Sequence, residues 1–500
     1  MKKFWLVLLS LGLVMAFSAS AFAVDVKVSG EFYAAGLYLN KTKVADVEGQ
    51  SDGEDGYLSN PSTAFYFQRL RVGTDFVVSP CLKLVTRFDA MERIWGGVRG
   101  ESGISSNAGV GAYGSDPDSA GTRTENQNIA FDYVYVDYVS PIGTFDVGYN
   151  SYGTTGTVFA NSTMAVGSIK YKYDFTQVPA SLMLGISKVK DTSASAVNGS
   201  AYWTDGDKDM YGIEGVYNFK DGKAGAKLSY YRYADTRPPT PSTALNSTTY
   251  NYIKAYYQLT PYAIAKIGPV NIQAELNWGF GDAKKYDNNS IVGKDVKLDQ
   301  LNGWVDATAN FGMFYAGGSV AYVSGDDPGT TDKDEGATNN GGNDYNPCLI
   351  LFNYDLTYWA GNVAGYDAAY SASTGAATKG VVNGPMMNAW FFQGRVGVKP
   401  TPQADVMLSV SYAFADKKPG VFNTAAPPVQ TGTYSNGTYG TEIDLTGTYK
   451  LTNNLSYMLG VGYLFTGDYF KGVDSGTNKV NDDFAFHVQN IVGLHFTCNI

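Results

Sequence analysis

The chain has 500 residues, a formal net charge of -10 and a pI near 4.8, which argues against nucleic acid as a partner. Glycine (58 residues), tyrosine (38) and phenylalanine (26) are abundant and only 17% of residues are charged, which favours glycine-kinked, aromatic-rich strands over a helical or α/β enzyme. Three cysteines without a CxxC pair exclude a disulfide framework, a zinc ribbon and a cytochrome.

Residues 1–23 are a predicted secretory signal peptide. Lys2 and Lys3 precede an apolar run, and Ala21-Phe22-Ala23 has the form of a cleavage site. Beyond it, no stretch approaches eighteen consecutive apolar residues, so we predict no transmembrane helix. An exported chain of this composition is expected to be a β-barrel.

From residue 24 onward, apolar residues alternate with polar or small ones, as in strands that have one apolar face. The clearest case is the hairpin 441–470, in which Ile443 and Leu445 share the apolar parity while Glu442 and Asp444 take the polar one. The alternation recurs in about eighteen runs, an even number, as the topology requires. We predict strands that begin near residues 24, 63, 82, 127, 144, 167, 180, 209, 224, 250, 270, 299, 313, 387, 404, 440, 455 and 484.

Short and long connections alternate along the whole chain. The short turns are predicted at 140–143, 176–179, 220–223, 267–270, 310–313, 399–403 and 452–454. The long, polar, glycine-rich connections are predicted near 151–166, 190–208, 234–248, 281–297, 325–385, 416–438 and 468–482. This asymmetry is typical of outer-membrane barrels, which have tight periplasmic turns and extended outer loops. We therefore predict an all-β fold, a transmembrane antiparallel up-and-down barrel over residues 24–500.

The loop 325–385 is the candidate for narrowing such a barrel, because wall side chains alone do not fill the lumen at this size. At roughly sixty residues it is too long for an inert connection. Its partly apolar core, from Tyr345 to Phe352, is unusual for a free surface loop. One alternative is that the loop enters the pore as a constriction, and the other is that it forms a lid on the outer surface. The constriction hypothesis rests on Tyr345, Asn346, Cys348 and Phe352.

Charged residues of the inward parity are predicted to line the pore. Arg69, Arg71, Lys83 and Arg87 fall on two neighbouring strands, where a basic ladder would select anions. The alternative is that Asp75 and Asp89 neutralise this ladder as ordinary ion pairs. The rest of the predicted lining is mixed in charge and leaves the sign of selectivity open; it comprises Glu275, Asp306, Arg395, Glu442 and Asp444, with Lys170, Lys172, Lys227, Lys450, Asp174, Glu214 and Asp405.

Other motifs carry little chemistry. Residues 109–114, GVGAYG, match a dinucleotide-binding pattern but lack the strand-to-helix context. The Asp205, Asp207 and Asp209 spacing resembles the start of a calcium loop, yet the required glycine and glutamate are absent, so no EF-hand is predicted. A loose calcium contact there or in 326–335 and a solvated acidic loop are the two alternatives.

The two histidines do not form a catalytic or metal site. His487 and His495 lie eight residues apart on one predicted strand, which separates them by roughly 27 Å. No nucleophile motif accompanies either histidine, so an outer-membrane hydrolase is only a minor alternative. We predict no enzyme activity, no catalytic residue, no metal and no cofactor.

Four stretches resemble porin-like outer-membrane proteins of sulfate-reducing and related anaerobic bacteria, a group distantly similar to alginate-export-type barrels. They are RLRVGTDFVVSPCLKLVTRFDAMERIWG (69–96), YVYVDYVSPIGTFDVGYNSYGTTGTVF (133–159), YAIAKIGPVNIQAELNWGFGDAKKYD (262–287) and VSGDDPGT with DYNPCLILFNYD (323–355), and the opening hairpin shares the resemblance. The resemblance implies an outer-membrane channel. Two features depart from it: the lumenal charges are mixed rather than strongly basic, and the chain ends in VGLHFTCNI without the terminal aromatic that barrel-assembly machinery reads.

The predicted function is passive diffusion of small hydrophilic solutes across the outer membrane of a Gram-negative bacterium. The alternatives are a specific channel for an anionic oligosaccharide or polymer, and a plugged barrel with a structural or surface role. Expected partners are outer-membrane lipid and lipopolysaccharide, the solutes themselves and the barrel-assembly machinery. A homotrimer stays open, because trimer contacts and lipid contacts would use the same apolar parity.

Overall fold

The computed structural model describes most of the predicted barrel and parts of its loops. The described residues are 24–41, 62–95, 129–152, 155–159, 164–191, 206–234, 252–287, 294–339, 344–354, 384–422, 430–472 and 483–499. The predicted signal peptide (1–23) and the GVGAYG stretch (109–114) lie outside them.

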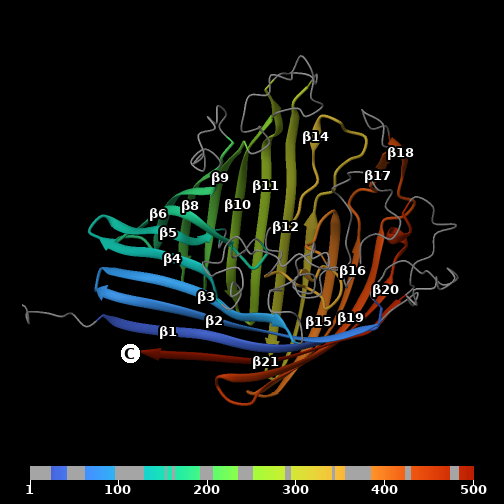
Figure 1. Ribbon diagram of the computed structural model, residues 1–500. Helices are drawn as coiled ribbons and strands as arrows, with labels where there is room; N and C mark the ends of the chain where they lie inside the picture. Colours follow the sequence, from blue (N-terminus) through green and yellow to red (C-terminus); the bar gives the residue numbers. More distant parts are fainter. Residues whose placement is uncertain are drawn as a thin grey trace, which may run out of the picture.

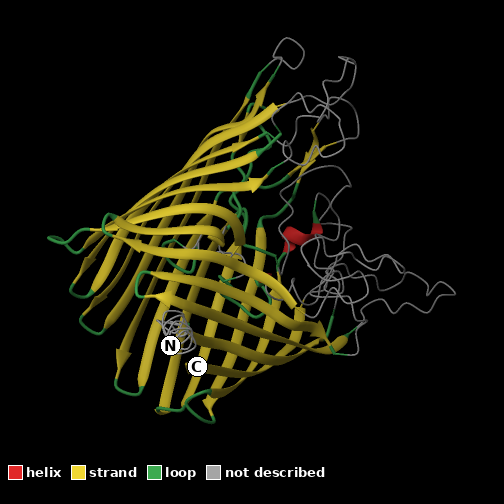
Figure 2. Ribbon diagram, turned by 60° about the vertical axis from the view of Figure 1, so that its left-hand side comes forward, coloured by secondary structure: helices red, strands yellow, loops and turns green. Residues whose placement is uncertain are grey.

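Within these residues, eighteen antiparallel strands form a closed barrel (Figures 1 and 2). Each strand pairs with its neighbours in the sequence, and the last strand pairs with the first from Lys27 to Tyr38, which closes the ring. The strands are β1 (Asp25–Leu39), β2 (Thr63–Ser79), β3 (Leu82–Ile94), β4 (Ile129–Ser140), β5 (Gly143–Tyr152), β6 (Met164–Asp174), β7 (Ala180–Lys190), β8 (Lys208–Phe219), β9 (Gly222–Tyr233), β10 (Tyr252–Ile267), β11 (Val270–Tyr286), β12 (Val296–Phe311), β13 (Phe314–Val323), β15 (Ala389–Thr401), β16 (Ala404–Phe414), β19 (Thr438–Lys450), β20 (Leu455–Thr466) and β21 (Asp483–Asn499).

The predicted fold class is confirmed, and each predicted strand start lies within a few residues of an observed one. Four short elements were not predicted, because they are too short to show a periodic pattern. These are β14 (Lys333–Asp334), which runs parallel to β12, the hairpin of β17 (Gly420–Phe422) and β18 (Gln430–Thr433), and the 3-10 helix η2 (Asp468–Lys471). No helix in the described parts of the chain has the length and apolarity needed to span a membrane.

The two faces of the wall differ as the alternating sequence predicts. On β11, Leu276 and Trp278 are each 41% exposed on the outside, while Glu275 and Asn277 are each 4% exposed and face inward. Large apolar side chains cover the outer face of the other strands in the same way. The polar and charged residues of the wall are therefore collected inside the barrel.

Two stretches between strands contact these inward-facing residues. The short inner segment (155–159) follows β5, and the long inner segment (344–354) precedes β15. The connection predicted at 151–166 lies between β5 and β6, and its residues 155–159 turn toward the inner face of the wall, because Thr157 donates hydrogen bonds to the inward-facing Glu275. The buried core of the molecule lies where the long inner segment meets the inner faces of β12, β13, β15 and β19.

Candidate functional site

The predicted basic ladder lies on the inner faces of β2 and β3, where acidic partners neutralise it. Arg71 donates two hydrogen bonds to Asp89, Nε to Oδ1 and Nη2 to Oδ2, both at 2.7 Å. Arg87 Nε donates to Asp132 Oδ2 at 3.0 Å. Two-pronged pairing of a guanidinium with a carboxylate fixes both groups and cancels most of their field.

The other two bases of the ladder are also close to carboxylates. Arg69 lies 3.5 Å from Glu92 and 3.9 Å from Glu31, while Lys83 lies 3.4 Å from Asp137 and 3.7 Å from Asp75. Four bases therefore face six acids, and the geometry supports the ion-pair alternative over an anion-selecting ladder. The two neutralising acids named from the sequence are within ion-pair distance of the ladder, Asp89 of Arg71 and Asp75 of Lys83.

Glu275, predicted to line the pore, holds the short inner segment. Its Oε2 accepts hydrogen bonds from the backbone N–H and the hydroxyl of Thr157, at 2.7 and 2.8 Å. Its Oε1 accepts a third bond from Asn277 Nδ2 at 2.8 Å. Gly156 adopts φ +83°, and a Cβ there would lie 2.4 Å from Glu275 Oε2, so this turn needs glycine. The carboxylate is thus an anchor that the protein itself occupies.

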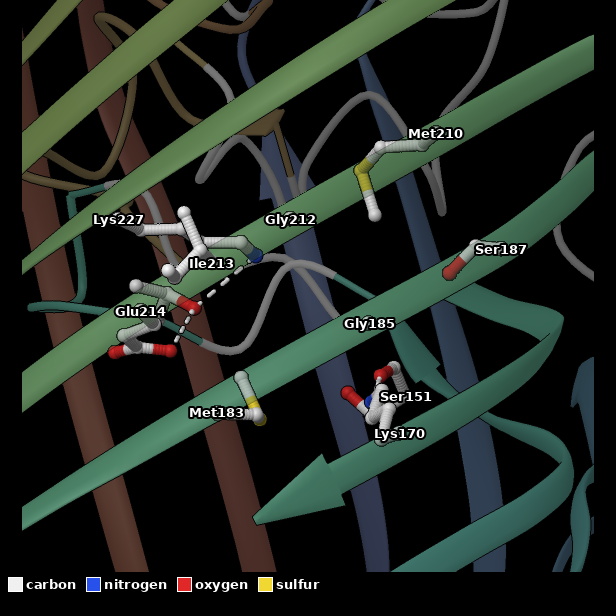
Figure 3. Close-up of a pocket in the computed structure, with 11 residues that line it drawn as sticks. Ser151, Lys170, Met183, Gly185, Ser187, Met210, Gly212, Ile213, Glu214 and Lys227 are labelled. Carbon is white, nitrogen blue, oxygen red and sulfur yellow. Dashed lines mark hydrogen bonds between the residues drawn. The ribbon is translucent and has the colours of Figure 1, made fainter. Parts of the chain in front are cut away.

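A small cavity with a mixed lining of polar and apolar side chains lies beside this anchor, between the segment and the inner faces of β6 to β9 (Figure 3). Lys227 Nζ donates to Thr155 Oγ1 at 3.2 Å, and that hydroxyl donates to Glu214 Oε2 at 3.3 Å. Lys170 Nζ donates to the carbonyl oxygen of Ser151. The cavity has a volume of about 30 Å³, which suits one or two water molecules rather than a solute.

The long inner segment is fastened to β19 through two carboxylates. Glu442 accepts hydrogen bonds from the backbone N–H groups of Ile350 and Leu351, both at 2.7 Å, and Asp444 accepts a longer one from Leu349 at 3.4 Å. Three successive backbone donors therefore point at the wall. The two predicted pore-lining acids on this strand are largely covered by the segment, with 0% and 3% exposure.

The predicted constriction residues form the buried side of this segment. Tyr345, Cys348 and Phe352 are 6%, 4% and 1% exposed, and Asn346 is half-buried. Burial also raises the pKa of the Tyr345 hydroxyl well above its usual range. In this part of the segment the exposed residue is therefore Asp344, with Asn346 partly exposed, whereas the aromatic rings are buried.

The two inner segments meet over the inner face of β12. The ring of Phe159 stacks on Trp304 at 6.0 Å and meets Tyr345 edge-on at 5.1 Å. Trp304 and Tyr345 also contact each other edge-on, at 5.7 Å. The sequence reasoning missed this junction, although an apolar Val158-Phe159 pair in a Gly/Thr-rich loop is the same kind of signal as the apolar core of the long segment.

Asp344 and Tyr345, at the start of the long inner segment, interact with opposite sides of the barrel wall. Tyr345 contacts Trp304 on β12, whereas Asp344 lies within electrostatic range of Arg71, Arg87 and Arg69 on β2 and β3. The pKa of Asp344 is raised by its partial burial, and these arginines oppose that rise. Because β3 and β12 are nine strands apart in a ring of eighteen, they face each other across the barrel.

Several other residues singled out from the sequence are also paired. Arg395 donates to Asp306 through Nη1 and Nη2, at 2.6 and 2.8 Å, in a second two-pronged pair. Lys188 lies 2.9 Å from Asp207 and 2.6 Å from Asp209, two of the three residues considered for calcium, while Asp205 lies outside the described residues. In the acidic run 326–335, Asp327 is paired with Lys417 at 3.2 Å.

No protein-family model and no curated protein matches the sequence. Among solved structures, the chain is similar to Pseudomonas aeruginosa OpdQ, with 10% identity and a TM-score of 0.44 over 95% of this chain and 98% of that one. It is also similar to a BenF-like porin from Pseudomonas fluorescens Pf-5 (9%, 0.45, 96% and 99%) and to Acinetobacter baumannii OccAB4 (10%, 0.44, 96% and 100%). The resemblance to proteins of sulfate-reducing bacteria and to alginate-export barrels stays a prediction.

Proposed function

We propose that this protein is an outer-membrane, porin-like channel through which small hydrophilic solutes diffuse passively. The observation that carries the proposal is the closed ring of eighteen strands with an apolar outer face and a polar, charged inner face. In a bilayer every backbone polar group needs a partner, and a closed barrel supplies one without leaving an edge. An inner face of charged residues is stable only against water or other polar groups.

The inner segments support a narrowed passage rather than a wide pore. A barrel of this size leaves an interior that its wall side chains do not fill. The long inner segment touches β12 at Tyr345 and β19 at Ile350, and its Asp344 reaches the field of the arginines opposite. We infer that the passage runs between Asp344 and the ladder on β2 and β3, with the short inner segment as a second border.

The paired charges favour a channel of weak selectivity. Each base of the ladder has a carboxylate within 4 Å, so little net field remains to sort anions from cations. A specific channel for an anionic oligosaccharide needs unpaired bases along its path, and the described ladder offers none. Recognition by the barrel-assembly machinery and assembly into a homotrimer stay predictions from the sequence.

Single-channel recording in a planar bilayer under a salt gradient tests the proposal. We expect ohmic steps and a small reversal potential, with no block by micromolar saccharides. Block by a micromolar anionic saccharide would instead identify the specific channel. Absence of conductance from folded protein would contradict both and leave the plugged, structural barrel.

A further inference from the structure

Three metal-ligating side chains meet where the long inner segment contacts the wall. Cys348 belongs to the segment, and Glu442 and Asp444 are successive inward-facing residues of β19. One ligand atom of each lies within 4.8 Å of the other two. Their exposed fractions are 4%, 0% and 3%, and in the described parts of the chain no other group of three such residues is this compact.

The charge of this cluster is not balanced by a cation in the described residues. Glu442 and Asp444 accept backbone hydrogen bonds from 349–351, but no described Lys or Arg lies within ion-pair distance of either carboxylate. Asp444 Oδ1 is buried and has no hydrogen-bond partner. The nearby acid Asp306, in contrast, has Arg395 at 2.6 Å. Two adjacent buried carboxylates without a counter-charge are costly unless something positive joins them.

The wall residue next to both carboxylates is a glycine. Gly462 on β20 faces the cluster, and a Cβ there would lie 2.8 Å from Asp444 Oδ1 and 3.5 Å from Glu442 Oε1. It would also lie 3.1 Å from Leu349 Cβ. Any larger residue at position 462 would crowd Asp444 Oδ1, so the wall residue nearest to this unpartnered oxygen contributes no side chain.

We propose that Cys348, Glu442 and Asp444 bind one divalent transition-metal ion of the zinc type, which joins the long inner segment to β19. Zinc accepts thiolate at about 2.3 Å and carboxylate oxygen at about 2.1 Å, which places tetrahedral ligand atoms about 3.5 Å apart, a distance these groups reach by a small inward movement. Calcium and magnesium prefer all-oxygen sites, so the cysteine selects against them. On binding, the thiol releases its proton to water, and a water molecule takes the fourth position.

The test measures metal binding to the full-length barrel folded in detergent, so it does not depend on transport. Zinc is titrated against a chelator and counted by mass spectrometry, and cobalt is used as an optical probe. We expect one high-affinity ion per chain and a thiolate-to-cobalt charge-transfer band. Cys348→Ser should abolish the band, while Cys81→Ser, which changes an exposed free thiol in the turn after β2, should keep it.

A second variant for the zinc-binding test is Asp444→Asn, which removes the charge of the side chain and keeps its shape. Loss of one of three protein ligands should weaken zinc binding by at least about tenfold, since even partners behind the ligands contribute that much. Folding of each variant is checked by its heat-modifiable mobility on a gel. If the parent protein binds zinc no better than Cys348→Ser and Asp444→Asn do, the carboxylates are neutralised by a proton and the proposal is wrong.

Discussion

The two inner segments are held inside the barrel by different means. The short segment (155–159) rests on large charged wall residues, and its main contacts are hydrogen bonds to Glu275 and Glu214. The long segment (344–354) rests on small wall residues and buries its own apolar side chains. The small inward residues beneath it are Ser409, Ser411, Gly460 and Gly462, and they lie beside Glu442, Asp444 and Gln393, which hydrogen-bond to the segment.

The difference shows how one alternating wall can accept a loop in two ways. At Glu275 and Glu214 the short segment supplies hydroxyl and backbone donors, and its main apolar contact is Phe159. Where the wall is reduced to glycine and serine, the loop can approach closely: a Cβ on Gly460 would lie 3.0 Å from Leu349 Cδ1. The long segment thereby becomes a small hydrophobic core, fastened at one point by Glu442 and Asp444.

Removal of the long segment should have the largest effect on the channel. Replacing 340–380 by a short Gly-Ser linker takes away the segment that extends toward the ladder, so we expect single-channel conductance to rise several-fold. Shortening 192–200, a connection between β7 and β8, is the matched control and should leave conductance unchanged. Equal conductance in both variants would mean that the long segment does not narrow the passage.

The wall was predictable from the sequence because its signal is periodic and repeated. The apolar exterior requires every second residue to be apolar over each strand, as in Ile443 and Leu445, and a tight turn must follow. Strand starts at Leu455 and Ala404, for example, agree with the prediction. The apolar run from Tyr345 to Phe352 likewise favoured a loop core, and in the structure Tyr345, Cys348 and Phe352 are buried.

The interior contacts were not predictable in the same way, because each depends on a pairing between residues far apart in the chain. Nothing local in the sequence relates Thr157 to Glu275, which lie 118 residues apart, or Ile350 to Glu442, 92 apart. The sequence therefore predicted inward-facing charges that line the pore, whereas many of them bind other groups of the protein. On the wall itself, the paired inward glycines Gly460 and Gly462 are a local signal for a closely packed segment.

Within the long segment, Phe352→Ala tests whether apolar packing is the dominant force. Phe352 is 1% exposed and contacts Phe391 and Tyr439, so its truncation should cost about 3 to 5 kcal/mol of docking free energy. Hydrogen exchange at the amides of Ile350 and Leu351 reports this as a loss of protection of about a hundredfold or more. The control is Phe392→Ala, because Phe392 follows Phe391 on β15 and faces outward. It should leave both amides protected. Unchanged protection in Phe352→Ala would mean that the carboxylates alone hold the segment.

For the short segment, Glu275→Gln tests whether hydrogen bonds to the wall carboxylate are the main anchor. The amide can accept only through one oxygen, so one of the three donors at this site loses its partner, which should cost about 1 to 3 kcal/mol. The measurement is hydrogen exchange at the amide of Thr157. Gln273→Ala changes another inward-facing residue of β11 and should have little effect. If the two variants behaved alike, packing of Phe159 on Trp304 would be the main anchor, and the contrast between the segments would disappear.

Substitutions in the basic ladder, which neither segment covers, should have the smallest effect on the channel, because each base of the ladder is paired with an acid. Arg71→Gln alone frees Asp89 inside the barrel and should shift the reversal potential under a salt gradient toward cation selectivity. Asp89→Asn alone should shift it in the opposite direction by a similar amount. The double variant removes both charges of a neutral pair, so its reversal potential should return close to that of the parent protein. A double variant that keeps the cation selectivity of Arg71→Gln would show that Arg71 acts on passing ions independently of its partner, and the ladder would then be a filter after all.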